Sequence, residues 1–365
     1  MDPRTRDHAE VLVDWSARIE SGDDVVVSVA SGAHDLAVAV AAVLGERGAN
    51  PFFRYDSSEV RRAYLRAHDG DFDPNPPHEL ALFESADAAL FLGGSRNTTE
   101  LADVPGAVRQ SHDRARAGIR EARMATDWVS TQHPTRAMAQ QAGMSLEAYA
   151  DFVYDAVLRD WEALAEEMAQ LKGILDEGRE VHLEGPQTDL RLSIEGRTAV
   201  NSAASVAYDS HNLPSGEVFT TPCDTEGTVT FDVPMTINGT RVRDVRLTFE
   251  DGQVIDFAAA QGESTIADVL ETDAGAKRLG ELGIGMNRGI DRVTDNILFD
   301  EKMGETVHLA LGRAYDATLP AGESGNESAV HVDLITDMST DSRLSVDGDI
   351  VQRNGRFRWE DGFEG

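Results

Sequence analysis

The chain has 365 residues, of which 41% are hydrophobic and 27% charged, as in a globular protein long enough for two domains. Its formal net charge of -32 repels nucleic acid and anionic lipid, so neither is expected as a partner. No apolar run approaches the roughly 20 residues that span a bilayer, and the polar N-terminus lacks an apolar signal core. We therefore predict a cytoplasmic protein.

The excess of acidic over basic residues indicates a protein adapted to a salty solvent. There are 65 acidic residues against 33 basic ones, and lysine occurs only at Lys172, Lys277 and Lys302. Repulsion among the carboxylates destabilises a compact fold, and molar salt screens it by shortening the Debye length to about 3 Å. This pattern favours a halophile, because an acidic protein of an ordinary cell need not avoid lysine. The single cysteine, Cys223, excludes an intrachain disulfide and a thiolate zinc cluster.

The first half of the chain alternates strand and helix patterns. Short apolar strand segments are separated by a helical one: strands at 24–29, 51–55 and 88–92, and a helix at 35–47. Strands separated by helices indicate βαβ units and a parallel sheet. From about Asp103 to Leu175 the pattern is helical throughout.

After Glu180 short strand patterns follow one another at 181–183, 189–194, 227–233 and 242–249. Asn238-Gly239 and Asp251-Gly252 are typical of hairpin turns. We predict an α/β N-terminal domain over 1–178, with a mostly parallel sheet and a helical extension. A mostly antiparallel β domain of the α+β class is predicted over 179–365.

The predicted N-terminal domain offers no recognisable site. The segment from Ser28 to Ala33 links a strand to a helix but lacks the glycine spacing of a dinucleotide fingerprint, and no GxxxxGK[ST] loop exists. A GxSxG elbow is absent, and Cys223 has no neighbour that suggests a nucleophile. No organic cofactor is expected.

Metal-capable side chains instead recur in the second half. Glu217 follows a Pro-Ser-Gly turn and begins an apolar stretch, and Glu281 stands among glycines and aliphatic residues. A buried carboxylate is costly without a cation or a hydrogen-bonded partner. Each glutamate is therefore either a ligand or a solvent-facing residue, Glu281 in the latter case at a helix end.

Two histidine-containing segments follow. His308 interrupts an apolar run, as a ligand or as a hydrogen-bonded core histidine. His331 and Asp333 are two apart on a predicted strand, so they share one face, which is either a ligand pair or a solvated surface. Carboxylates and imidazoles without thiolates suit Zn²⁺, Mn²⁺ or Co²⁺. Five or six such ligands exceed the three or so of a single catalytic zinc, which indicates two metal ions.

At these segments the chain resembles the aminopeptidase T family, which includes the AmpS and PepS types. The motifs that carry the resemblance occur in the family's order: 212–220, Leu279-Gly280-Glu281, 298–301, 308–312 and 331–333. Residues 131–135 and 138–145 resemble the family's N-terminal region, so the likeness covers nearly the whole chain.

The resemblance implies a two-domain homodimer with a pair of catalytic divalent ions. The implied ligands are Glu217, Glu281, His308, His331 and Asp333, with Glu281 bridging. Glu301 is the implied catalytic carboxylate or a further ligand, and Tyr315 lies at the implied site. Before the histidine the family tends towards a Gly-Gly pair, where this chain has Gly304-Glu305. Glu305 is a second carboxylate between Glu301 and His308, which leaves the role of Glu301 open.

The resulting prediction is a metallo-aminopeptidase that removes N-terminal residues from peptides by water activated at two metals. Glu301 serves as its base, and a metal and Tyr315 stabilise the oxyanion. One alternative is a metallo-dipeptidase or another amidohydrolase. The other is a non-enzymatic α/β binding protein whose histidines and glutamates merely pack.

Overall fold

The computed structural model describes residues 2–364 as two compact units. The first comprises the chain as far as Arg159 together with Ala204–Pro214, and the second comprises Asp160–Ala203 and the chain from Ser215 onwards. The predicted boundary after residue 178 falls inside the second unit, because helix α9 (Trp161–Glu177) contacts strands β7 and β9 there. No helix in the described part of the chain is both long and apolar enough to cross a membrane.

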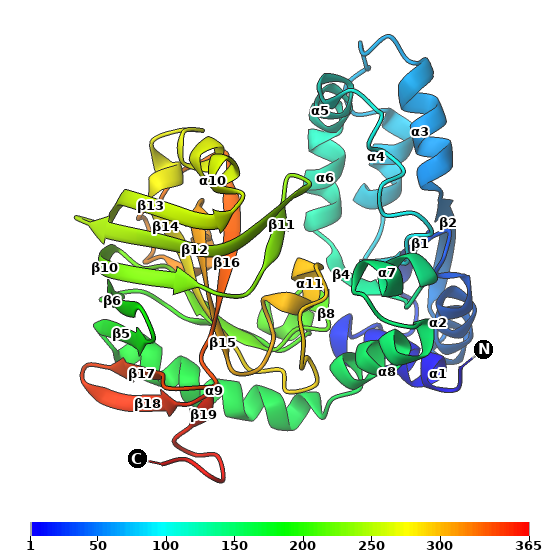
Figure 1. Cartoon of the computed structure of the whole chain (residues 1–365). Helices are drawn as coiled ribbons and strands as arrows, with labels where there is room; N and C mark the ends of the chain where they lie inside the picture. Colours follow the sequence, from blue (N-terminus) through cyan, green and yellow to red (C-terminus); the bar gives the residue numbers. More distant parts are fainter. Residues whose placement is uncertain (1, 365) are drawn as a thin grey trace. The chain divides into compact units, whose positions relative to one another are not determined.

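A five-stranded parallel sheet forms the centre of the first unit, in the order β2-β1-β3-β4-β8 (Figure 1). Its strands are β1 (Asp24–Ala30), β2 (Asn50–Asp56), β3 (Ala88–Gly93), β4 (Asp127–Gln132) and β8 (Asn212–Leu213). The α-helices of this unit are α1 (Arg4–Glu10), α2 (His34–Arg47), α3 (Ser58–Ala67), α4 (Pro77–Glu84), α5 (Gly106–Ala115), α6 (Ala117–Met124), α7 (Arg136–Gln141) and α8 (Leu146–Val157). A π-helix, Val11–Ser16, follows α1, and a 3-10 turn spans Val206–Tyr208.

The apolar run of β1 explains its place in the interior of the sheet, between β2 and β3. Its valines are buried on both faces of the strand, as in parallel sheets covered on both sides. Helices α4 and α6 cover one face through Phe83 and Ile119, which pack on Val26 and Ala89. The predicted mostly parallel sheet is confirmed.

One prediction about the first half was wrong. Strand β4 lies within the stretch expected to be helical throughout. Only Val129 and Thr131 of this strand are fully buried, so its sequence carries little apolar patterning. Its strand conformation comes from pairing with β3, a contact between distant segments that overrides local propensity.

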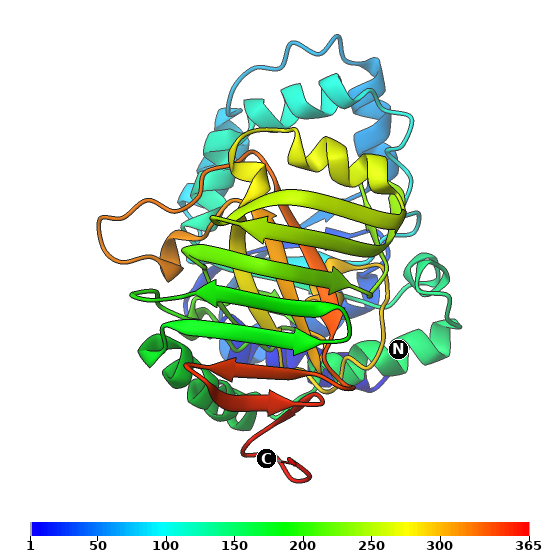
Figure 2. The ribbon, with the colours of Figure 1, turned by 60° about the vertical axis from the view of Figure 1, so that its left-hand side comes forward.

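The second unit holds two largely antiparallel sheets. The nine-stranded sheet runs β11-β12-β10-β6-β5-β17-β18-β19, with β13 beside β12, and the five-stranded sheet runs β16-β15-β14-β9-β7. In Figure 2 the strands of the larger sheet lie across those of the smaller sheet behind it, which makes a β-sandwich. The predicted antiparallel C-terminal architecture is confirmed.

The elements of this unit have the following bounds. The larger sheet contains β5 (Glu180–Gly185), β6 (Thr188–Ser193), β10 (Asp224–Phe231), β11 (Met235–Ile237), β12 (Thr240–Glu250), β13 (Gln253–Gln261), β17 (Arg343–Val346), β18 (Asp349–Arg353) and β19 (Arg356–Phe357). The smaller contains β7 (Val200–Ser202), β9 (Glu217–Thr220), β14 (Leu279–Gly285), β15 (Thr306–Gly312) and β16 (His331–Asp337). Besides α9, the helices are α10 (Glu263–Leu270), α11 (Ile297–Asp300) and the 3-10 turns Gly275–Lys277 and Asp316–Thr318.

Both predicted hairpin turns occur where the sequence placed them. Asn238-Gly239 joins β11 to β12, and Asp251-Gly252 joins β12 to β13. All four residues have positive φ, between 51° and 82°, as a two-residue turn between twisted antiparallel strands requires.

Candidate metal centre

Three strands of the five-stranded sheet bring two glutamates and a histidine together. On β14, which is buried along its whole length, Glu281, Gly283 and Gly285 are two residues apart and so project to one face. Directly opposite residues of antiparallel strands project to the same face. Glu217 of β9 lies opposite Gly285, and His308 of β15 lies opposite Gly283. Glu217, Glu281 and His308 therefore share one face.

Strand β16 extends this face with the remaining predicted ligands. Asp333 pairs with Ala310, which itself pairs with Glu281, and His331 pairs with Gly312. Each of these polar residues thus has a glycine or alanine as a cross-strand partner on one side, which leaves space above the sheet for carboxylates and imidazoles. All five predicted ligand residues lie on one face of one sheet.

Two glycines are required by this arrangement. A Cβ on Gly283 would lie 2.0 Å from Nε2 of His308, so only glycine lets the imidazole occupy its position. Gly216, immediately before Glu217, has φ 110°, a conformation that favours glycine. Its carbonyl accepts a hydrogen bond from the backbone of Met286, which ties the turn before Glu217 to the end of β14.

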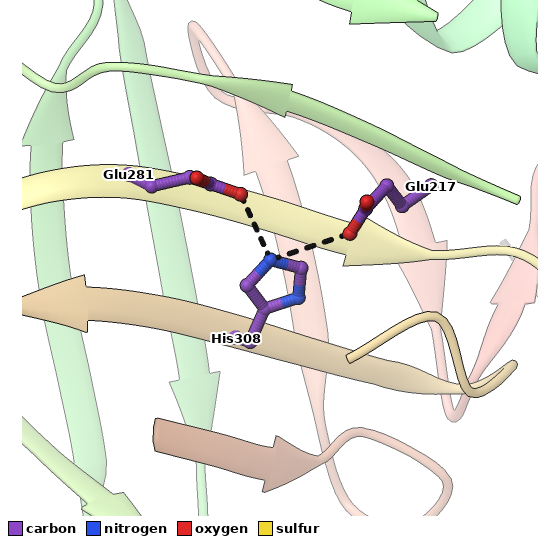
Figure 3. A group of neighbouring side chains, drawn as sticks. All are labelled: Glu217, Glu281 and His308. Atoms are coloured by element: carbon purple, nitrogen blue, oxygen red, sulfur yellow. Dashed lines mark hydrogen bonds and ion pairs between the residues drawn. The ribbon is translucent and has the colours of Figure 1, made fainter. Parts of the chain in front are cut away.

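The side chains meet at hydrogen-bonding distance (Figure 3). Nε2 of His308 lies 3.0 Å from Oε1 of Glu281 and 3.5 Å from Oε2 of Glu217. Nε2 of His331 lies 3.5 Å from a carboxylate oxygen of Glu281 and from one of Asp333. Glu217, Glu281 and His308 are at most 6% exposed, and each has a potential ligand atom within 4.8 Å of those of the other two.

The imidazole of His331 has a fixed orientation. Its Nδ1 lies 2.8 Å from the backbone carbonyl of Arg313, to which it donates a hydrogen bond. Such a bond leaves Nε2, on the carboxylate side, free to act as a ligand atom. The ring of Tyr315 lies edge-on to that of His331 at 5.0 Å and also contacts Phe219, which lies opposite Gly283 on the same face. Tyr315 is 47% exposed, so this edge of the cluster is open to solvent.

Glu301 reaches the cluster through a residue that the sequence analysis missed. It follows helix α11, and its carboxylate accepts a hydrogen bond from Nζ of Lys302. Nζ of Lys302 also lies 3.4 Å from Oε1 of Glu217, and the lysine is fully buried. The available signal was rarity: Lys302 is one of the chain's few lysines and directly follows Glu301.

Glu305, the second carboxylate in this loop, has a different partner. It forms an ion pair with Arg288 at 2.6 Å, and Arg288 in turn pairs with Glu360 near the C-terminus. Its φ of 68° lies in the left-handed region that favours glycine. Of the two carboxylates in question, Glu301 is the one in contact with the polar cluster.

A buried aspartate holds the loop that carries Glu301. One carboxylate oxygen of Asp300 accepts hydrogen bonds from the backbone N–H and the hydroxyl of Thr294, both at 2.8 Å, and the other accepts from the backbone of Asn296. Burial raises the pKa of Asp300 to about 6. Asp300 directly precedes Glu301 in the chain, and its hydrogen bonds hold the loop in place.

Burial and the neighbouring carboxylates raise the pKa values of several titratable groups in this cluster. Burial opposes the charged form of His308, but its bond to Glu281 and the charge of Glu217 outweigh burial and raise its pKa to about 10. His331 behaves alike through Asp333, and its pKa rises to about 9. Burial raises the pKa of Glu281 and takes that of Glu301 to about 8, against the opposing charge of Lys302.

These residues fit a divalent metal. The donor set consists of carboxylate oxygens and imidazole nitrogens, which suit a hydrolytic Zn²⁺, Mn²⁺ or Co²⁺ site. Among the described residues, Nδ1 of His308 has no hydrogen-bond partner, and Oε2 of Glu217 has none beyond its 3.5 Å ion-pair contact with His308, although both atoms are buried. The protonated histidines provide the positive charge that these carboxylates attract, and a metal ion would replace those protons.

Comparison with known proteins shows the family to which the chain belongs. The model of the thermophilic metalloprotease (M29) family matches residues 1–357. Aminopeptidase 2 of Geobacillus stearothermophilus is 28% identical, covering 96% of this chain and 94% of its own length. Aminopeptidase T of Thermus thermophilus is 29% identical, with 96% and 97% covered. A solved structure of wild-type AmpT from Thermus thermophilus superposes with a TM-score of 0.84 at 27% identity, covering 97% of this chain and 99% of that one. The predicted resemblance is confirmed, and the chain belongs to the M29 family of thermophilic metalloproteases.

Proposed function

We propose that this chain is a metallo-aminopeptidase, which hydrolyses the first peptide bond of a peptide with a free N-terminus. The observation that carries the proposal is the shared face of the five-stranded sheet, where Glu217, Glu281 and His308 converge in the interior. Membership of a metalloprotease family and relatives named aminopeptidases support it.

The residues that would hold two divalent ions are Glu217, Glu281, His308, His331 and Asp333, and Glu281 would be shared between the ions. Glu281 supports this role because its two oxygens face different histidines, Oε1 towards His308 and Oε2 towards His331. When bound, such ions supply Lewis acidity, which polarises a carbonyl group and makes a water molecule more acidic.

Glu301 is the proposed base. Its pKa of about 8 lies near neutral pH, where a general base is most effective. It takes one proton as the oxygen of water bonds to the scissile carbonyl carbon. It then delivers that proton to the departing nitrogen as the carbon–nitrogen bond breaks, so that it ends in its starting state.

Tyr315 is the proposed hydrogen-bond donor to the oxyanion. Burial and the surrounding carboxylates raise its pKa, so the phenol keeps its proton at neutral pH. Its ring lies against His331 at the exposed edge of the cluster, where a substrate can approach. A hydrogen bond that strengthens as charge develops on the carbonyl oxygen lowers the barrier.

The acidic face also explains the proposed choice of chain ends. A free α-amine could be held by a bound divalent ion through its lone pair or by a carboxylate of the site, whereas an acylated nitrogen offers neither an available lone pair nor a charge. The test uses leucine p-nitroanilide, its N-acetylated form and dileucine, before and after treatment with a chelator. The proposal predicts cleavage of the free-amine anilide, little cleavage of the acetylated form, and loss of activity that added Zn²⁺ or Co²⁺ restores. Cleavage of dileucine alone would favour the dipeptidase alternative, and activity resistant to chelation would refute the metal-dependent function.

The proposed reaction does not depend on the oligomeric state, the cellular location or the salt content of the solvent. The predicted homodimer, cytoplasmic location and saline environment stay predictions. A homodimer predicts a solution mass of about twice the chain's 39.6 kDa, which light scattering measures.

A further inference from the structure

Lys302 is unusual in this chain. It is fully buried, although lysine is the charged residue that a protein least readily hides. Arginine supplies nearly all other positive charge in the sequence. A buried ammonium is retained only where it is paired, and this one lies in the loop that follows Glu301.

The ammonium stands between two carboxylates that belong to different parts of the proposed site. One contact is with Oε1 of Glu217, at 3.4 Å, and the other is with Oε1 of Glu301. Oε2 of Glu217 is left on the side of His308. Lys302 therefore occupies one oxygen of a proposed ligand and one oxygen of the proposed base.

Hydrogen bonds on both sides fix the backbone of Lys302. The N–H of Lys302 donates to the carbonyl of Phe299 at 3.0 Å, and its own carbonyl accepts from the N–H of Asn287 at 3.1 Å. The backbone of Lys302 is thus bonded to helix α11 on one side and to the segment after β14 on the other. Because the side chain is also fully buried and contacts Glu217 and Glu301, the ammonium has little freedom to move away from these carboxylates.

A carboxylate beside two divalent ions has a strong tendency to become a further ligand, and a ligand cannot serve as a free base. Glu301 carries the same functional group as Glu217 and Glu281, so its chemistry alone does not distinguish it from them. What distinguishes it is its set of partners: Glu301 is hydrogen-bonded to Lys302, whereas Glu217 and Glu281 both face the imidazole of His308, and Glu217 lies 3.4 Å from the ammonium.

Resting on the function proposed above, we propose that Lys302 is a positioning residue that holds Glu301 out of the ligand set and so keeps it available as the base. This role explains why a buried ammonium is found in a site proposed to bind cations, although it would repel metal ions bound there. Lys302 is predicted to weaken metal binding and to support turnover, an opposition that a purely structural residue would not show.

The experiment compares Lys302→Met with Lys277→Met, which removes the same charge from an exposed residue of the same unit. Zinc affinity is measured by chelator competition on the full chain, with zinc alone as the probe. Kinetics on leucine p-nitroanilide give kcat and KM. Lys302→Met should bind zinc at least as tightly as the unchanged protein, on the order of tenfold tighter from the lost repulsion. Its kcat should fall on the order of 100-fold with little change in KM, and Lys277→Met should match the unchanged protein.

A double variant keeps the test decisive if Lys302→Met alone does not fold. Glu301→Gln together with Lys302→Met removes one negative and one positive charge from the same contact. Compared with Glu301→Gln alone, it should bind zinc no more weakly and lose no further kcat, because Lys302 acts through Glu301. Zinc binding by Lys302→Met that is weaker than in the unchanged protein would overturn the proposal. If that variant does not fold, weaker zinc binding or a further loss of kcat in the double variant, relative to Glu301→Gln alone, would overturn it. If the unchanged protein hydrolyses no peptide substrate, the proposed function fails, and the zinc comparison still decides whether Lys302 opposes metal binding.

Discussion

The substitution Gly283→Ala tests the proposed centre with a single added carbon atom. The new Cβ would lie 2.0 Å from Nε2 of His308, whereas ordinary contacts begin at 3.4 Å, so the imidazole must move by about 1.4 Å. A zinc–nitrogen bond of about 2.0–2.1 Å tolerates an error of about 0.2 Å. Because His308 is fully buried, its imidazole would move against neighbouring side chains rather than into bulk solvent. We therefore expect His308 to be lost as a ligand and zinc affinity to fall by 100-fold or more, about 2.7 kcal/mol.

The assay is chelator competition for zinc, with thermal unfolding measured in parallel. Overpacking costs about 1–3 kcal/mol of stability, so the variant should still fold. Gly173→Ala is the matched control, because its Cβ would meet no atom within 4 Å and it lies inside helix α9 of the same unit. That control should bind zinc normally and gain up to about 1 kcal/mol of stability. Unchanged zinc affinity in Gly283→Ala would refute the placement of His308 as a ligand.

Four further predictions follow from the same site. Glu301→Gln should lower kcat by about 10²–10⁴-fold while metal content by atomic emission stays at its normal level, and near-normal turnover would remove Glu301 from the chemistry. Metal binding at pH 7.5 should release at least two protons, those of His308 and His331, whose pKa values are about 10 and 9 without metal. Calorimetry in buffers of different ionisation enthalpy counts the released protons, and release of none would contradict the ligand assignment. In the metal-free protein the raised pKa values of His308 and His331 contribute to the free energy of unfolding. This contribution is complete below pH 6.5 and is lost as the pH rises through 9 to 10. The urea midpoint should therefore fall between pH 6.5 and 10, and a flat profile would contradict the raised pKa values. Asp300→Ala should cost about 1–3 kcal/mol of unfolding free energy by removing the acceptor of the Thr294 bonds, and Asp316→Ala, at an exposed aspartate, should cost little.

The sequence predicted the architecture where apolar patterning is strong. The valine run of β1 and the Asn-Gly and Asp-Gly turns identified a parallel sheet and two hairpins that the structure contains. Strand β4 was missed because only two of its residues are fully buried, and its pairing with β3 is a tertiary effect. The place of helix α9 in the second unit also depends on contacts with strands far along the chain.

The candidate residues were recognisable, but their convergence was not deducible from local pattern. His331 and Asp333 share a face by strand periodicity alone, whereas Glu217 and Glu281 each allowed a solvent-facing alternative until strand register placed them. Register depends on which strands pair, which one sequence does not state. Lys302 escaped notice because no periodicity marks a residue in a loop after a one-turn helix, and its burial depends on the turn that Asp300 anchors.

The central claim is that one face of the five-stranded sheet binds two divalent ions. Anomalous diffraction from a crystal of the zinc-loaded protein, recorded at the zinc edge, tests it most directly. The account predicts two peaks per chain, bounded by Glu217, Glu281, His308, His331 and Asp333, with Glu281 contacting both. No peak at this face, or zinc bound only elsewhere on the acidic surface, would contradict it.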